Sequence, residues 1–448
     1  MRSFLLLCVA AVIPAVEVVR DEWFVGTLGG APSATMHQRI ERLDDGRTAV
    51  IGETSIVIAR TLGAQRVRIE VRDRQRLVED ASGRLLEGSF EHDEGAGPVV
   101  ALGRIEAGRL RGQVTALGRT WPIDEALKPG FEPRGDAWFQ ERLGQGGASI
   151  VIAGSITLLS NRLTPVQTTA TPRGAEGSSF RWDLRMDVAP VPMALVMAPG
   201  GRLQRMTMSL GPISIVFTPS DGPVALVPAD LSPAGLVKAA GPAPAARGEN
   251  RLRLPTGVTL PPNPFQAEVD GVVVVRDQAR AEDAQPADTG STPLCEADAP
   301  EVVAWASQQV TGITDPAERA ERLRRAVRAH ITTKDLNVAE GSAVQTLRNR
   351  EGDCSEHATL LTAALRAQEI PARIVVGLVY SAPHGGWVGH AWTEARVAGA
   401  WTLLDAAYPG LARCQYLALA SAGDQGANGA LVGVLAGLLG QTITNVTK

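Results

Sequence analysis

The sequence predicts a chain of two parts, an antiparallel β-rich region followed by an α+β domain. Turn-forming residues are plentiful, with 47 Gly and 29 Pro, and the aromatic share is only 4%. Short segments that alternate apolar and polar residues run through the first 276 residues, which is the period of half-buried strands. Apolar residues at helical spacing begin only at residue 301. With 448 residues and 44% hydrophobic side chains, the chain can form two or three domains.

Residues 20–276 make up the predicted β-rich region. Segments such as TAVIGETSIVIAR, GASIVIAGSITLL and FRWDLRMDV are separated by Gly, Asp, Asn and Pro at intervals of about 8–12 residues. The pattern favours antiparallel sheet with one buried face, either as a sandwich or as one curved sheet. The polar, proline-containing stretch 277–300 is predicted to be a linker or a long surface loop.

The α+β domain is predicted to span residues 301–448. Asp315 stands at a helix N-cap position, with Pro316 at the first helical position. A buried helix is expected over residues 355–368, and Pro371 prevents its continuation. The segments ARIVVGLVY, WVGHAWTEARV and AWTLLDAAY then have the composition of strands. Helices followed by an antiparallel sheet indicate an α+β domain and not a parallel βαβ one.

The first 19 residues resemble an export signal. Arg2 precedes an apolar stretch over residues 4–13, and Pro14-Ala15 could precede a cleavage site. We therefore expect export to the periplasm or cell envelope, although a buried N-terminal strand or helix is an alternative. Neither this stretch nor the apolar C-terminal segment 429–447 is long enough to span a bilayer, so no integral membrane segment is expected after signal removal.

Charge and cysteine usage exclude several classes of function. A net charge of −4 with no sustained basic run gives no electrostatic case for nucleic acid binding. The four cysteines include no CxxC pair, and His and Cys do not cluster at ligand spacing, so neither a metal nor another cofactor is expected. In an oxidising compartment Cys295 and Cys414 could form one disulfide, and the alternative is two separate buried thiols.

Cys354 is the first candidate catalytic residue. It follows a turn, Glu351-Gly352-Asp353, and falls at the start of the predicted buried helix. Backbone N–H groups at a helix N-terminus stabilise a thiolate, which is the reactive form of cysteine, and could also hold an oxyanion. The alternative is a cysteine that packs as a small apolar side chain.

His390 and Asp405 supply the partners that a nucleophilic cysteine needs. His390 lies on the strand WVGHAWTEARV, and Asp405 ends the next strand, AWTLLD. The turn at residues 398–400 makes these strands antiparallel neighbours, which can bring the carboxylate beside the imidazole. A histidine can accept the thiol proton, and a carboxylate can fix its tautomer. The alternatives are a structural histidine and a turn-capping acid.

The segment LRNREGDCSEHATLLTAALRAQEIPARIVVGLVY, followed by GHAWTEARVAGAWTLLDAA, resembles the transglutaminase-like superfamily of papain-like cysteine enzymes. The resemblance implies a papain-like transglutaminase core preceded by the β-rich region, and a protein or peptide substrate. It implies Cys354 as nucleophile, His390 as general base and acid, and Asp405 as the residue that orients His390. Relatives usually have Pro and Thr after this aspartate, whereas this chain has Ala406 and Ala407.

Three further residues could support the site. His357 lies at i+3 from Cys354, so it could tune the thiolate or bind substrate, with a supporting polar role as the favoured alternative. Trp392 and Glu394 share a strand face with His390 by the period-2 rule. Trp392 is expected to be a core anchor, and Glu394 could order the site or lie at the surface.

These residues leave three functions open. A thioester formed at Cys354 from a peptide or side-chain amide could pass to water, as in a peptidase or amidase, or to an amine, as in a cross-linking transferase. Water at about 55 M favours hydrolysis, because an amine would have to be bound and no amine site is evident. In the third hypothesis the protein is mainly an envelope binding or scaffold module that uses the β-rich region.

Overall fold

The computed structural model describes residues 16–62, 65–95, 97–116, 118–159, 162–188, 192–210, 213–230, 236–256, 258, 260, 263–333, 341–408, 410–422 and 438–446. The predicted export signal lies outside this part of the chain up to residue 15, and strand β1 begins at Glu17. Residues 429–437 of the C-terminal apolar segment also lie outside it. Within these ranges no helix has both the length and the apolar character needed to cross a membrane.

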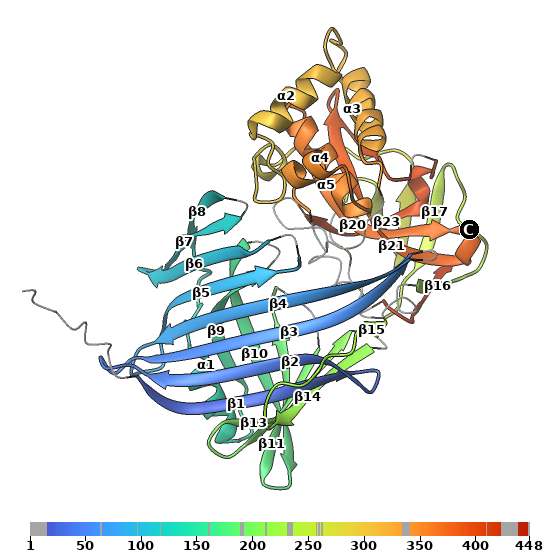
Figure 1. Cartoon of the computed structure of the whole chain (residues 1–448). Helices are drawn as coiled ribbons and strands as arrows, with labels where there is room; N and C mark the ends of the chain where they lie inside the picture. Colours follow the sequence, from blue (N-terminus) through green and yellow to red (C-terminus); the bar gives the residue numbers. More distant parts are fainter. Residues whose placement is uncertain are drawn as a thin grey trace, which may run out of the picture.

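The N-terminal strands form one continuous sheet with the order β8-β7-β6-β5-β4-β3-β2-β1-β14-β13-β12-β11-β10-β9, and β15 pairs with β3 (Figure 1). Every pairing along this path is antiparallel, as the alternating pattern predicts. The strands are β1 (Glu17–Leu28), β2 (Ala31–Arg42), β3 (Thr48–Leu62), β4 (Gln65–Glu79), β5 (Leu85–Asp93), β6 (Val99–Glu106), β7 (Arg109–Ala116), β8 (Arg119–Ala126), β9 (Val151–Leu159), β10 (Arg162–Glu176), β11 (Ser179–Met186), β12 (Met193–Ala198), β13 (Arg202–Leu210), β14 (Ile213–Ser220) and β15 (Ala229–Asp230).

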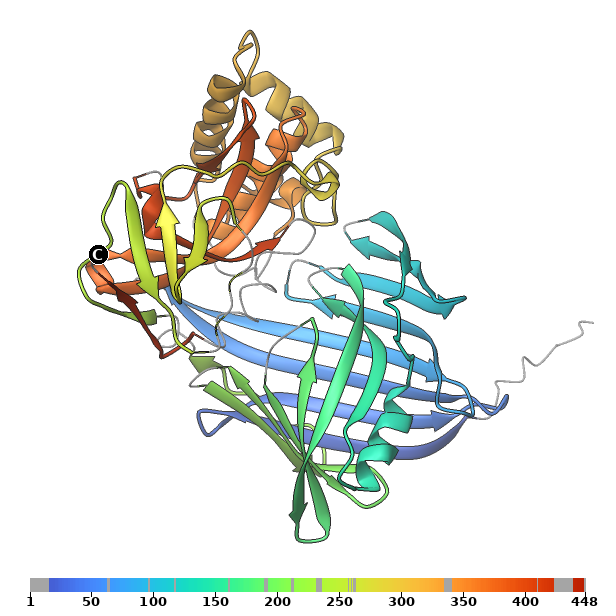
Figure 2. The ribbon, with the colours of Figure 1, turned by 180° about the vertical axis from the view of Figure 1, so that it is seen from behind.

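This sheet curves until its two ends face each other, so the curved-sheet alternative is the one observed. Strand β9 lies opposite β5, and β10 lies opposite β6 and β7 (Figure 2). Ile156 and Leu163 pack into the same apolar cluster as Phe90 and Leu110. A Cβ at Gly103 would come within 2.2 Å of Cδ2 of Leu163, so a larger residue would displace the Leu163 side chain. Helix α1 (Asp136–Gly144) packs against β9 and β11–β13, beside these ends.

The second sheet has the order β18-β19-β17-β24-β16-β21-β20-β23, with β22 paired to β21. Its strands are β16 (Leu236–Ala240), β17 (Glu249–Arg253), β18 (Gln266–Val269), β19 (Val272–Arg276), β20 (Ala372–Ser381), β21 (Gly386–Val397), β22 (Ala400–Leu404), β23 (Tyr416–Ala422) and β24 (Thr442–Asn445). The sequence pattern predicts one β-rich region over residues 20–276, but its last four strands, β16–β19, pair in the C-terminal sheet instead. Alternation shows that a strand is half-buried and does not show which strand it pairs with.

The stretch 277–300, predicted as a linker, packs closely on the C-terminal domain. Its 3-10 turn η2 spans Pro286–Asp288, and Cys295 joins the main core cluster. Glu296 is buried and accepts hydrogen bonds from the Ser342 hydroxyl at 2.7 Å and the Val344 amide at 2.9 Å. The polar composition of this stretch therefore reflects buried hydrogen-bonded side chains as well as exposed ones.

Four helices, α2 (Pro300–Gln309), α3 (Pro316–His330), α4 (Ala343–Asn349) and α5 (Cys354–Arg366), gather on one side of the second sheet (Figure 1). The predicted cap at Asp315 is confirmed, since its carboxylate accepts from the Glu318 amide at 2.8 Å. Helix α5 packs directly on β20 and β21, and the Thr393 hydroxyl of β21 donates to the Ala358 carbonyl of α5 at 3.1 Å. Short 3-10 turns η3 (Ala382–His384) and η4 (Arg413–Gln415) join strands. Strands β20–β23 follow the helices and pair antiparallel as predicted, whereas β16 and β24 of the same sheet pair in parallel.

Candidate active site

Cys354 is the first residue of α5, as the sequence predicts. The preceding Asp353 is the N-cap: its carboxylate accepts from the Ser355 amide at 2.8 Å, and the Glu356 side chain accepts from the Asp353 amide at 2.8 Å. Gly352 has φ +153°, and a Cβ there would lie 2.3 Å from Cβ of Glu356. This glycine therefore lets the turn close onto the helix and sets where Cys354 begins.

The surroundings of Cys354 do not favour a thiolate in the resting site. The side chain packs on a small apolar cluster formed by Ala358, Ile374, Val376 and Ala391. Burial raises the pKa of the Cys354 thiol well above its ordinary value, the Asp353 carboxylate raises it further, and the adjacent Ala391 amide lowers it only in part. This differs from the sequence expectation, because burial disfavours the thiolate and the capping carboxylates add negative charge beside the sulfur.

His390 and Asp405 meet as the sequence predicts. His390 lies on β21 at 1% exposure, and Asp405 directly follows β22 at 4% exposure. The imidazole Nε2 and the carboxylate Oδ2 are 2.8 Å apart. Because a carboxylate only accepts hydrogen bonds, Nε2 carries the proton, and Nδ1 is the ring nitrogen that can take another.

Cys354 lies next to this pair at a gap along β21. Along one edge of β21, β16 pairs with residues 386–388 and β22 pairs with residues 393–397. Among the described strands, none pairs with residues 389–392 on this edge. Cys354 packs on the apolar cluster that includes Ala391, the neighbour of His390, and lies next to the Ala391 amide. The structure thus places His390 and Asp405 in contact, and it places Cys354 of α5 beside the strand neighbour of His390.

Both oxygens of Asp405 are fully engaged. Oδ1 accepts from the Ala407 and Tyr408 amides, each at 2.8 Å, and Oδ2 accepts from the Tyr416 hydroxyl at 2.7 Å in addition to His390. Burial raises the pKa of Asp405, but the hydrogen bond and charge of His390 and these other donors outweigh it, so the pKa lies below its ordinary value. Asp405 is therefore held as an anion beside the imidazole.

Two tyrosines at the site were not found from the sequence. Tyr416 begins β23 and is fully buried, and burial together with the nearby carboxylate raises its pKa above the ordinary value. The Tyr408 ring lies 4.9 Å from the His390 ring and is 48% exposed, so it forms part of the surface over the imidazole. The Pro that relatives carry after the aspartate is absent here, and the amides of residues 407 and 408 still bind Oδ1.

Of the three supporting candidates, Trp392 is placed nearest the imidazole. Its indole is 1% exposed, stacks at 6.2 Å on His390 and meets Tyr416 edge-on at 5.1 Å. His357 is buried on α5, and its Nδ1 donates to the Asp353 carbonyl at 2.6 Å, which braces the turn before Cys354.

Glu394 belongs to a separate buried ion network. It is fully buried, and its carboxylate accepts a hydrogen bond from Arg373 at 3.1 Å. Both carboxylate oxygens also accept from Nδ2 of Asn263, each at 3.1 Å. Arg413 lies 3.5 Å away. The surface alternative for Glu394 is therefore not the one observed, and its contacts join Asn263, which precedes β18, to β20 and η4.

The other two cysteines of the described residues are free thiols in different clusters. Cys295 packs with the helices and Cys414 packs with β16, β17 and β23, so the disulfide alternative does not apply. Burial raises the pKa of Cys295 to about 11. Among residues that the structure describes, no group of three or more His, Cys, Asp and Glu side chains is placed to hold a metal ion.

Residues 303–406 match the family model of the transglutaminase-like superfamily. The chain carries a transglutaminase-like domain. The matched range includes Cys354, His390 and Asp405, and it ends before Tyr408 and Tyr416. The N-terminal curved sheet and strands β16–β19 lie outside the matched range.

Similar solved structures overlap the chain only loosely. A protein from Cytophaga hutchinsonii, provisionally described as a cysteine protease, is 16% identical with a TM-score of 0.30, covering 41% of this chain and 80% of that one. A beta-barrel-like protein of a domain of unknown function from Brucella abortus is 13% identical with a TM-score of 0.34, covering 45% of this chain and 95% of that one. No curated protein matches this chain. Scores this low carry no argument about the activity of the transglutaminase-like domain.

Proposed function

We propose that the transglutaminase-like domain is a cysteine enzyme that transfers the acyl group of a peptide or side-chain amide to water. The observation that carries this proposal is the buried 2.8 Å hydrogen bond between His390 and Asp405, next to the strand residue on which Cys354 packs. A nucleophile, a base and a residue that orients the base are the parts that such a reaction requires.

The geometry supports a general-base route. Because the pKa of the Cys354 thiol is raised, the sulfur is protonated at rest, and His390 Nδ1 takes its proton as the sulfur attacks the substrate carbonyl carbon. Asp405 stays ionised and stabilises the imidazolium. The imidazolium then gives its proton to the leaving nitrogen as the C–N bond breaks, which leaves a thioester on Cys354.

The oxyanion needs hydrogen-bond donors at the helix start. The Asp353 side chain already binds the amides of Ser355 and Glu356. The Cys354 amide has no hydrogen-bond partner within the described ranges, so it is the donor that α5 offers to the tetrahedral intermediate. His390 then removes a proton from water, which attacks the thioester and releases a carboxylic acid and the free thiol.

A turnover assay on glutamine-containing peptides, with and without an added primary amine, tests this function. We expect mass changes of deamidation or peptide-bond cleavage in both conditions, and none with Cys354→Ala. Cys414→Ala is the matched control, because this thiol lies in another cluster, and it should keep full turnover. Products that carry the amine would establish a transferase instead, and equal turnover by Cys354→Ala would overturn the proposal.

A further inference from the structure

A cavity of about 400 Å³ lies in the helical layer, between α2, α3 and the residue that follows α4. None of the triad residues lines it. Its walls are formed by Trp305, Gln309, Arg322, Arg325, Ala326, Ala329, His330 and Arg350. The cavity therefore has three arginines and no acidic side chain.

Each of the three arginines donates one hydrogen bond to the protein through its Nε. Nε of Arg322 donates to the Gln309 carbonyl at 3.2 Å, and Nε of Arg350 donates to the His330 carbonyl at 3.2 Å. Nε of Arg325 donates to Glu321 at 2.7 Å. Their terminal nitrogens make no hydrogen bond within the described part of the chain. Each guanidinium is thus oriented by one protein acceptor while its outer donors stay available.

The carboxylate that pairs with Arg325 does not neutralise this cavity. Glu321 accepts from both Arg324 and Arg325, and the hydrogen bond from Arg324 in particular lowers the pKa of Glu321 to about 2. One negative charge is therefore shared between two guanidiniums, only one of which lines the cavity. Arg322 and Arg350 form no ion pair among the described residues.

An aromatic wall completes the cavity. Trp305 is half-buried, and its ring meets the His330 ring edge-on at 5.4 Å. His330 is fixed in turn, because its Nε2 donates to the Leu347 carbonyl at 2.7 Å. A flat apolar group of a ligand could lie against this wall while an anionic group meets the guanidiniums.

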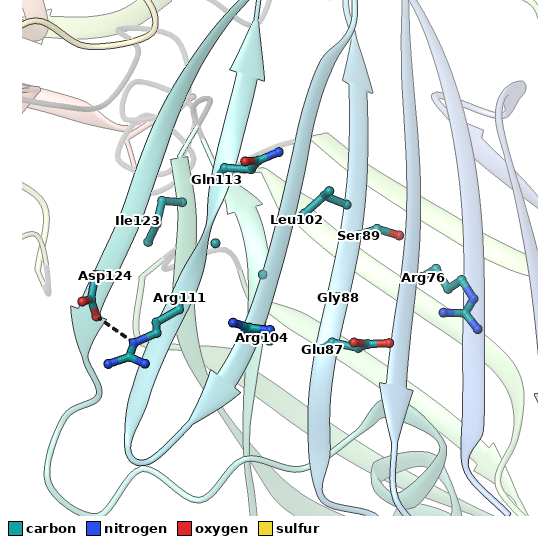
Figure 3. A pocket seen from close by; sticks show the side chains of 12 residues that line it. Arg76, Glu87, Gly88, Ser89, Leu102, Arg104, Arg111, Gln113, Ile123 and Asp124 are labelled. Atoms are coloured by element: carbon teal, nitrogen blue, oxygen red, sulfur yellow. Dashed lines mark ion pairs between the residues drawn. The ribbon is translucent and has the colours of Figure 1, made fainter. Parts of the chain in front are cut away.

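A second cavity shows that arginines alone do not define such a site. It has a volume of about 720 Å³ and lies on the face of β4–β8 (Figure 3). Arg76, Arg104 and Arg111 line it together with Glu87 and Asp124, and Arg111 pairs with Asp124 at 3.5 Å. Both signs of charge are present there, whereas the cavity in the helical layer is basic throughout.

We propose that the cavity between α2 and α3 binds a small ligand that carries a phosphate or carboxylate group beside a flat apolar ring. Planar guanidiniums match the geometry of both anions, and Trp305 supplies the surface for the ring. This site is separate from the triad, and the proposal does not depend on the activity proposed above.

Calorimetric titration of the full chain tests the site with phenyl phosphate, benzoate, inorganic phosphate and neutral phenol as probes. We expect saturable binding of one phenyl phosphate or benzoate per chain, weaker binding of inorganic phosphate, none of phenol, and weakening with added salt. A preference between phenyl phosphate and benzoate tells which anion the site is built for. Arg322→Gln and Arg325→Gln should each weaken binding by about tenfold.

Arg348→Gln is the matched control, because Arg348 is exposed on α4, pairs with Glu301 and does not line the cavity. It should bind as the unaltered protein does. An equal loss with Arg348→Gln would show non-specific charge attraction and overturn the proposal, as would the absence of saturable binding of either ring-bearing anion. Circular dichroism confirms that each variant is folded, and having two cavity variants keeps the test decisive if one of them is not.

Discussion

The N-terminal sheet and the transglutaminase-like domain both bury carboxyl groups, but they surround them differently. Glu79 at the end of β4 is 5% exposed, and its hydrogen bond from the Trp138 amide is long, at 3.4 Å. Burial raises the pKa of Glu79 to about 7. Asp405 is equally buried, yet four donors hold its pKa below the ordinary value.

This difference separates a carboxyl group that the fold tolerates from one that the site uses. A carboxylate can stabilise an imidazolium only while it is ionised, so its donors must offset the cost of burial. Asp405 has such donors, and Glu79 does not. Glu394 is a third case, a buried acid that pairs with two arginines and lies outside the His390–Asp405 pair.

The largest effect is expected from Asp405→Asn. An asparagine amide would donate to Nε2 of His390, which forces the proton onto Nδ1 and removes the base that Cys354 needs. Turnover should fall by about 10⁴-fold with little change in stability. Steady-state kinetics and thermal unfolding measure the two quantities. Asp288→Asn, which alters another buried carboxyl group far from the triad in the chain, should keep its turnover.

Glu394→Ala should act mainly on the stability of the protein. It leaves Arg373 and Arg413 buried without their shared carboxylate, and burial already lowers the pKa of Arg413 to about 10. The free energy of unfolding should fall by about 3–5 kcal/mol in urea titrations. The exposed ion pair between Glu301 and Arg348 offers the control, because Glu301→Gln should lower the free energy of unfolding by less than about 1 kcal/mol. Equal losses in the two variants would remove the distinction between buried and exposed acids.

Glu79→Gln should stabilise the protein at neutral and mildly alkaline pH. The pKa of Glu79 is raised from 4.5 to about 7, so the folded state holds a proton that the unfolded state has lost between these values. Stability contributed by this group is complete below pH 4.5 and is lost as the pH rises through about 7. The free energy of unfolding of Glu79→Gln should exceed that of the unaltered protein by roughly 2–3 kcal/mol at pH 8, and the two should be equal at pH 4. Glu91→Gln on the exposed face of β5 should change neither value; a similar gain there would argue against burial as the cause.

Tyr416→Phe should have the smallest effect of the four. It removes one donor from Asp405, so the pKa of Asp405 rises and protonation of the carboxylate begins at higher pH. Turnover should fall by about tenfold, and the acid limb of its pH profile should move to higher pH. Tyr380→Phe on the neighbouring strand β20 is the control, with an unchanged profile. A tenfold loss with an unmoved acid limb would indicate a packing role for Tyr416 only.

The order of helix start, histidine strand and aspartate strand was enough to find Cys354, His390 and Asp405, because Cys354 and Asp405 stand at recognisable element boundaries and His390 lies on the strand between them. The place of Tyr416 at the site could not be predicted from the sequence. It lies on β23, which is separated from β21 by β20, and sequence patterns do not specify strand order. The same limit placed strands β16–β19 with the wrong sheet. The direction of the Cys354 pKa was missed because burial and the capping acids outweigh the helix terminus.

Trapping the acyl-enzyme tests the central claim most directly. A glutamine-containing peptide is mixed with the protein, the reaction is stopped in acid, and the digest is read by mass spectrometry. We expect a thioester adduct on Cys354 that lacks the leaving amine, absent from Cys354→Ala and strongly reduced in Asp405→Asn. An adduct on another residue, or none on Cys354 while product accumulates, would contradict it.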